Sequence, residues 1–160
     1  MHFKRFAHFA VFAALALPAV AQAQAGPVRY GAYYDETISG SCSSAAVSCA
    51  GSFSALPSDK MTTIQRIHCN FTSNVPMARA RFGVSTTSGG AALPREIALP
   101  LSIANTMHIN GSWYAATDTD TQWLVGQGRF PFAEIFTNQS SVSGFTCTLI
   151  GTLSDPIPGQ

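Results

Sequence analysis

Hydrophobic and polar residues alternate with a period of two along much of the chain, which is the pattern of β-strands that bury one face. The longest such run covers residues 61–72, where four odd-numbered positions are apolar: Met61, Ile67, Cys69 and Phe71. The same pattern predicts strands at 76–85, 97–103, 107–113 and 145–153, with further strands at 28–34, 51–56 and 123–132. Beyond residue 25, no uninterrupted window has the i, i+3, i+4, i+7 spacing of an amphipathic helix.

Segments rich in turn-forming residues separate these runs, as they do in antiparallel sheets. They cover residues 73–76, 86–92, 105–106, 116–121 and 138–144. Roughly seven to nine short strands divided by turns are typical of an antiparallel β-sandwich or jelly roll. Pro100 cannot donate a ladder hydrogen bond, so it predicts an edge strand or a bulge. Because there is no internal repeat or linker, we expect residues 26–160 to form a single all-β domain.

The first 25 residues have a different pattern from the rest of the chain. Lys4 and Arg5 precede an apolar stretch at 6–17. A segment of small residues follows, with Ala-Gln-Ala cleavage sites that end at Ala23 or Ala25. This order is typical of a secretory signal peptide, and the apolar stretch is too short to span a bilayer. The cleavage region resembles those of exported bacterial proteins. We therefore predict a secreted or periplasmic protein with no membrane span after cleavage.

The charge balance excludes several classes of partner. The whole sequence has nine Lys or Arg and eight Asp or Glu, a net charge of +1. Without Lys4 and Arg5, seven basic residues face eight acidic ones, which gives a net charge of −1, and Lys60 is the single remaining lysine. Such a chain does not bind nucleic acid by bulk charge. Its apolar content also excludes a polar disordered tail.

The four cysteines all follow the predicted leader. An even number of cysteines in an exported chain predicts two disulfides. Cys42 and Cys49 are close in sequence, which favours their pairing and leaves Cys69 to pair with Cys147. The last two lie on the apolar side of their predicted strands, as an inward-facing bridge requires. No Cys-x-x-Cys pair occurs, so we expect no zinc or other metal site and no cofactor.

One predicted hairpin gathers basic side chains on a single face. If strands 61–72 and 76–85 pair across 73–76, the polar positions of both point to the same side. This pairing would bring together Arg66, His68, Arg79 and Arg81. Such a cluster suits an anionic envelope component or an acidic glycan. The alternative is a solvated sheet face whose arginines pair with carboxylates elsewhere.

The segment 111–123 gathers aromatic and acidic residues. Trp113, Tyr114 and Trp123 flank a predicted loop that carries Asp118 and Asp120. Aromatic surfaces beside hydrogen-bonding groups are typical of sugar-binding sites. The two aspartates also suit calcium, although the glycine and distant glutamate of an EF-hand loop are missing. The alternative is that the tryptophans belong to the core and the loop is an ordinary turn.

Two classes of function fit these features. The preferred one is a non-enzymatic domain that binds a glycan or an envelope component, or that associates with itself. Self-association would use Tyr30, Tyr33 and Tyr34, whereas in the other interpretation these residues cover the end of the sandwich. The alternative is a small secreted hydrolase that pairs His68 or His108 with a nearby carboxylate. The sequence contains no Gly-x-Ser-x-Gly or His-Glu-x-x-His motif, which favours the binding domain over the enzyme.

Overall fold

The computed structural model describes residues 26–101 and 106–157, which form eight strands and no helix. The predicted leader, residues 1–25, lies outside the described residues. The strands are β1 (Val28–Tyr30), β2 (Tyr33–Ser52), β3 (Met61–Ser73), β4 (Met77–Ser85), β5 (Ala92–Leu99), β6 (Thr106–Ile109), β7 (Ser112–Val125) and β8 (Phe130–Ser154). All pairings are antiparallel, so the all-β antiparallel prediction is confirmed.

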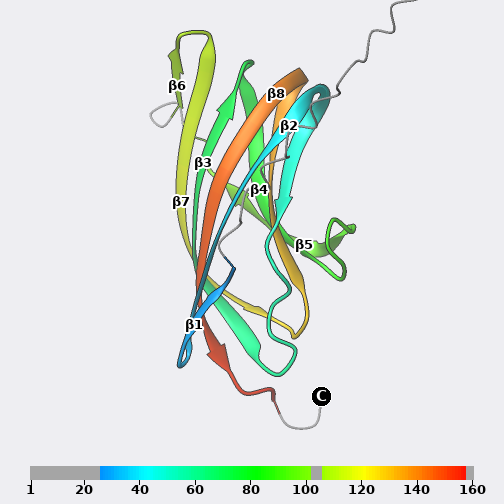
Figure 1. Ribbon diagram of the computed structural model, residues 1–160, viewed down its shortest axis with the longest axis vertical. Helices are drawn as coiled ribbons and strands as arrows, with labels where there is room; N and C mark the ends of the chain where they lie inside the picture. The colour runs from blue at the N-terminus through cyan, green and yellow to red at the C-terminus, as the bar shows by residue number, and fades with distance from the viewer. Residues whose placement is uncertain (1–25, 102–105, 158–160) are drawn as a thin grey trace, which may run out of the picture.

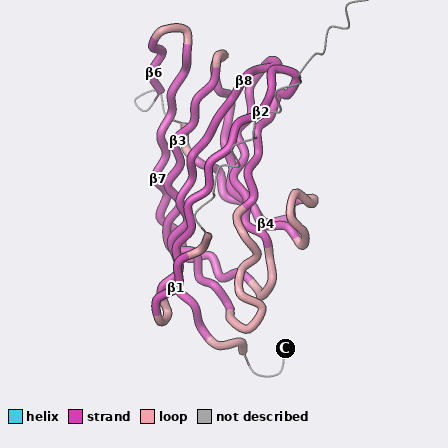
Figure 2. Tube along the Cα trace, in the orientation of Figure 1, coloured by secondary structure: helices cyan, strands magenta, loops and turns pink. Residues whose placement is uncertain are grey.

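The strands belong to one open sheet that folds over into two layers (Figures 1 and 2). The first layer has the order β1-β2-β8-β3-β7-β6, whereas β4 and β5 continue from the other half of β8. β2 pairs with β8 over Tyr33–Cys42 and again, after two register shifts, over Ser48–Ser52. The two layers are therefore hydrogen bonded through β2 and β8, whereas the predicted sandwich or jelly roll has two separate sheets.

β2 reverses its direction between the two layers. The Cα atoms of Cys42 and Cys49 are 5.6 Å apart, whereas seven extended residues span about 23 Å. β8 follows the same turn, because its residues 143–152 pair with the first half of β2 and its residues 132–136 with the second half. The paired strands thus carry the sheet from one layer to the other.

A hydrophobic core fills the space between the layers. The ring of Phe82 from β4 lies 5.9 Å from that of Trp123 on β7 and 6.1 Å from that of Phe53 (centroid distances). The ring of Phe145 lies where a side chain at Gly51 would be, so β2 comes close to it only because Gly51 has no Cβ. The fully buried residues include Ile38, Ile64, Ile67, Phe71, Ile135 and Leu149.

Both predicted disulfides are confirmed. Cys69 and Cys147 are directly opposite each other on β3 and β8, both fully buried, with Cα atoms 4.1 Å apart. Cys42 and Cys49 close the turn of β2. Structural disulfides of this kind persist in an oxidising, extracytoplasmic environment. None of the residues described here forms a helix long and apolar enough to cross a membrane.

A buried carboxylate holds the segment that follows β2. Glu36 is 4% exposed and accepts hydrogen bonds from the Tyr34 hydroxyl at 3.0 Å, the Ser54 amide at 2.9 Å and the Ser54 hydroxyl at 2.8 Å. Burial raises the pKa of the Tyr34 hydroxyl, and the nearby Glu36 charge raises it further. Tyr34 thus belongs to the core and is not available for self-association, unlike Tyr30 and Tyr33, which are 85% and 41% exposed.

Two bulges change which residues face inward. A register shift between Ile64 and Arg66 switches the parity of β3, so Thr62 and Ile64 are buried and Met61 is not. The prediction that Met61 shares a face with Ile67 is therefore wrong. A second shift, after Met77, leaves Ala78 exposed, although the other apolar positions predicted for β4 are buried.

Several predicted strands prove to be interrupted by a tight turn. The runs at 28–34, 107–113 and 123–132 each divide into two strands, at turns that contain Gly31, Gly111 and Gly128 with positive φ. Of the predicted strand 51–56, only its first two residues belong to β2. β5 ends at Leu99, before Pro100, and pairs with β4 alone, so it is an edge strand in the described part of the chain.

One predicted turn and one predicted hairpin are wrong. Residues 116–121 lie inside β7, whereas the turn predicted at 138–144 falls within β8, where this strand passes from one layer to the other. β3 pairs with β7 and β8, while β4 pairs with β5 and β8, so the predicted hairpin of β3 with β4 does not form. The reason is that β8 is long enough to pair with β3 in one layer and with β4 in the other.

Candidate functional site

Short polar side chains form rows across the outer face of the first layer. The register across β2, β8, β3 and β7 gives three neighbouring rows, which we call the hydroxyl face: Thr37–Thr148–His68–Asp118, Ser39–Thr146–Asn70–Ala116 and Ser41–Gly144–Thr72–Tyr114. Intervening residues of the same strands, such as Ile38, Cys69 and Cys147, are buried in the core. The period-two pattern thus places the hydroxyl face toward solvent.

The side chains of the first two rows orient one another. The hydroxyls of Thr37 and Thr148 are 2.8 Å apart, and those of Ser39 and Thr146 are 3.0 Å apart. The amide nitrogen of Asn70 is 3.2 Å from Nε2 of His68. Each hydroxyl has one donor and two acceptor positions, so these contacts leave hydrogen-bonding capacity for a ligand.

Two adjoining hollows open onto this face. One, of about 330 Å³, is lined mostly by short polar side chains of β2, β8 and β3, among them Ser39, Ser41 and Thr146, and we call it the polar hollow. The other, of about 380 Å³, is mainly apolar and lies between β3 and the β6–β7 hairpin. Asn70 and Thr72 line both hollows, so the two lie side by side.

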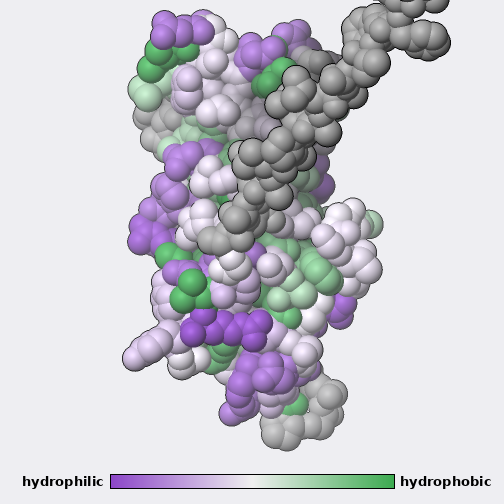
Figure 3. Space-filling model, in the orientation of Figure 1, coloured by the Kyte–Doolittle hydropathy of each residue, from purple (hydrophilic) through white to green (hydrophobic). Residues whose placement is uncertain are grey.

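Exposed apolar side chains line the second hollow. Tyr114 is 40% exposed, and Met107 and Ile109 on β6 are 58% and 48% exposed. Apolar residues near the free end of the β6–β7 hairpin are visible in Figure 3. An aromatic ring and aliphatic groups therefore lie beside the neutral hydrogen-bonding groups of the polar hollow.

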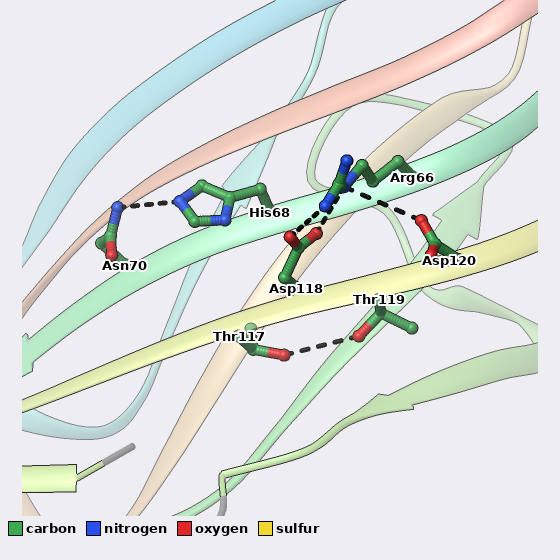
Figure 4. A network of polar contacts seen from close by, with 7 residues as sticks. All are labelled: Arg66, His68, Asn70, Thr117, Asp118, Thr119 and Asp120. Atoms are coloured by element: carbon green, nitrogen blue, oxygen red, sulfur yellow. Dashed lines mark hydrogen bonds and ion pairs between the residues drawn. The ribbon is translucent and has the colours of Figure 1, made fainter.

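On the same outer face, Arg66 of β3 forms ion pairs with two aspartates of β7. Arg66 forms a two-point contact with Asp118, of which the Nε to Oδ1 distance is 2.7 Å, and lies 3.7 Å from Asp120 (Figure 4). These hydrogen bonds lower the pKa of the Asp118 carboxyl and raise that of Arg66. Both aspartates thus form ion pairs with Arg66. No group of three or more metal-ligating side chains occurs among the described residues.

The predicted basic cluster is divided between the two layers. Arg66 and His68 lie on β3 in the first layer, whereas Arg79 and Arg81 lie on β4 in the second. Arg81 donates to Glu134 at 2.7 Å and to Glu96 at 2.6 Å. The guanidinium of Arg79 lies 4.1 Å above the ring of Phe136. The structure thus does not bring these four residues together.

The predicted aromatic site is also divided, because its residues alternate between the two faces of β7. Trp123 is 5% exposed and belongs to the core. Trp113, on the same inward side, is stacked on the ring of His108 at 4.7 Å. Tyr114 lies on the outer face with Asp118 and Asp120. Of the three aromatic residues, Tyr114 is the one that contributes to the hydroxyl face.

Neither histidine has a carboxylate at hydrogen-bond distance among the described residues. His68 is partly buried and contacts Asn70, while Asp118, its neighbour across the strands, bonds to Arg66. His108 is exposed and stacks on Trp113. The geometry therefore offers no histidine–carboxylate pair of the kind that a hydrolase uses.

Residues from distant parts of the sequence make up much of the hydroxyl face, and the sequence analysis missed them. Thr146 and Thr148 were identifiable only as polar positions of a predicted strand, while Thr37 and Ser39 lie in a part of β2 that was not predicted to be a strand. No protein-family model matches the chain, and no curated protein is found to be similar to it. The geometry of this face is therefore the basis on which we infer a function.

Proposed function

We propose that the protein is a secreted or periplasmic, non-enzymatic domain of sandwich-like architecture that binds a glycan on its hydroxyl face. The observation that supports this most strongly is that a hollow lined by polar side chains adjoins an apolar hollow at Asn70 and Thr72. Sugars present hydroxyl groups at their edges and C–H groups on their faces. A site for them combines neutral hydrogen-bonding side chains with an exposed aromatic ring.

The charge distribution favours a neutral sugar over an anionic envelope component. The rows Ser39–Thr146–Asn70–Ala116 and Ser41–Gly144–Thr72–Tyr114 contain no charged residue. Arg66, the nearest cation on the same face, is engaged by Asp118 and Asp120. An anionic ligand would have to compete with both carboxylates for this guanidinium.

Two further observations support a binding domain in an extracytoplasmic compartment. The paired cysteines favour an oxidising environment, in agreement with the predicted signal peptide. The separation of His68 and His108 from carboxylates favours binding over hydrolysis.

Screening the oxidised, exported protein on a glycan array tests the proposal. We expect neutral glycans to be retained and Tyr114→Ala to weaken their binding about tenfold, as the loss of a stacking ring would. Tyr30→Ala is the matched control, because Tyr30 is 85% exposed on β1, away from both hollows, and should bind as the parent protein does.

Two results would contradict glycan binding. One is an array on which no glycan is retained, and the other is equal retention by the Tyr114→Ala variant and the parent. If the array is blank and the molecular mass rises with protein concentration, self-association is the better assignment. Sedimentation measurements on the parent and on Tyr30→Ala would then show whether Tyr30 takes part in the association.

A further inference from the structure

A separate hollow of about 310 Å³ lies where the end of β7 meets β5 and the turn that precedes β8. Its apolar lining residues include Leu93, Pro94, Trp123 and Leu124. None of its lining residues belongs to the hydroxyl face or to the hollows beside it. Whatever this hollow binds is therefore independent of the proposed glycan.

Two arginines line the hollow, Arg95 and Arg129, and no acidic residue does. The guanidinium of Arg95 lies 5.0 Å from the centre of the Trp123 ring, which holds this side chain over the apolar floor. Within the described residues, neither arginine forms an ion pair with a carboxylate. Arg66 and Arg81, by contrast, each contact two carboxylates.

We propose that this hollow binds a small organic anion with an apolar tail. Arg95 and Arg129 would hold a carboxylate or sulfate head group, because guanidinium groups match the planar oxygen pairs of such anions. The tail would lie on Leu93, Leu124 and the part of Trp123 that lines the hollow. Burial of the tail adds the hydrophobic term that a simple anion lacks.

Tryptophan fluorescence provides a local readout of this binding. The sequence contains two tryptophans, so Trp113→Phe leaves Trp123 as the only reporter. We expect saturable changes in its emission when sodium octanoate or octyl sulfate is added below the micellar concentration. Comparing the two ligands shows whether a carboxylate or a sulfate head group is preferred.

Removal of the two positive charges should weaken binding specifically. In the Trp113→Phe background, Arg95→Gln with Arg129→Gln should lower the affinity for octanoate at least about tenfold. Arg79→Gln is the matched control, since Arg79 also lies over an aromatic ring without an ion pair in the described structure but is remote from the hollow. The control should bind octanoate as the background protein does.

Measurements on the unsubstituted arginines keep the test independent of how well the double variant folds. Sodium chloride should weaken the binding of octanoate and leave that of neutral octanol unchanged, because added ions screen the guanidinium groups. Equal affinity for octanol and octanoate would overturn the role of the arginines. Equal affinity for acetate and octanoate would overturn the role of the apolar floor.

Discussion

Thr62 is a buried polar residue whose hydroxyl has no hydrogen-bond partner among the described residues. Its side chain is fully buried on β3, where the bulge that follows Ile64 sets which residues face the core. A buried hydroxyl without a partner loses its hydration and gains nothing in return. The position therefore favours an apolar residue of the same shape.

We expect Thr62→Val to raise the free energy of unfolding by about 1 kcal/mol, because valine retains the shape and removes the unpaired hydroxyl. Urea denaturation of the parent and the variant measures the difference. Thr63→Val is the control, since Thr63 is partly exposed and points to the other side of β3. A loss of stability in Thr62→Val alone would mean that the hydroxyl has a partner in solution.

At the scale of elements, the turn of β2 brings its second half against the ring of Phe145 on β8. A Cβ atom at Gly51 would overlap this ring. The distance between the two halves of β2 thus depends on a position that carries no side chain. This requirement is invisible in the alternating pattern, because the ring belongs to a strand about 95 residues further along the chain.

Gly51→Ala should therefore destabilise the protein by about 1–3 kcal/mol through overpacking. Thermal unfolding followed by circular dichroism measures the effect. Gly126→Ala serves as the matched control, because a Cβ atom at Gly126 would meet no atom within 4 Å and its φ is not positive. If the two variants lose the same stability, the close contact with Phe145 does not exist in solution.

At the scale of the whole molecule, the two disulfides close loops of very different length. Cys69–Cys147 joins residues 78 positions apart, whereas Cys42–Cys49 joins residues 7 positions apart. A longer loop removes more conformational entropy from the unfolded chain. Because Cys69 and Cys147 also join β3 to β8, this bridge lies within the first layer that carries the hydroxyl face.

Replacing Cys69 and Cys147 by alanine should cost about 2 kcal/mol more than replacing Cys42 and Cys49, as the chain-entropy relation predicts for these loop lengths. Chemical denaturation of the two double variants under the same conditions gives the comparison. An equal loss in both would show that the entropy of the unfolded chain does not dominate.

The sequence alone predicted the antiparallel all-β class and both disulfide pairs of this protein, and it predicted the inward side of most positions in β3, β4 and β8. The fold class and the inward positions depend on local alternation, which every short window carries, and the disulfide pairs followed from the spacing of the four cysteines. Gly31, Asn110-Gly111 and Gly128 were also local signals for turns, although the sequence analysis did not use them.

Only the tertiary structure decided which strands pair and which polar residues meet. Because β8 pairs with both β3 and β4, Arg79 and Arg81 lie in the other layer from Arg66 and His68. The predicted basic cluster therefore does not form, and the outer face of the first layer is the hydroxyl face. The physical reason is that strand order and register follow from contacts between residues far apart in sequence, and a single bulge moves side chains from one face to the other. The alternating pattern specifies that a residue faces outward, while its neighbours there are set by the fold.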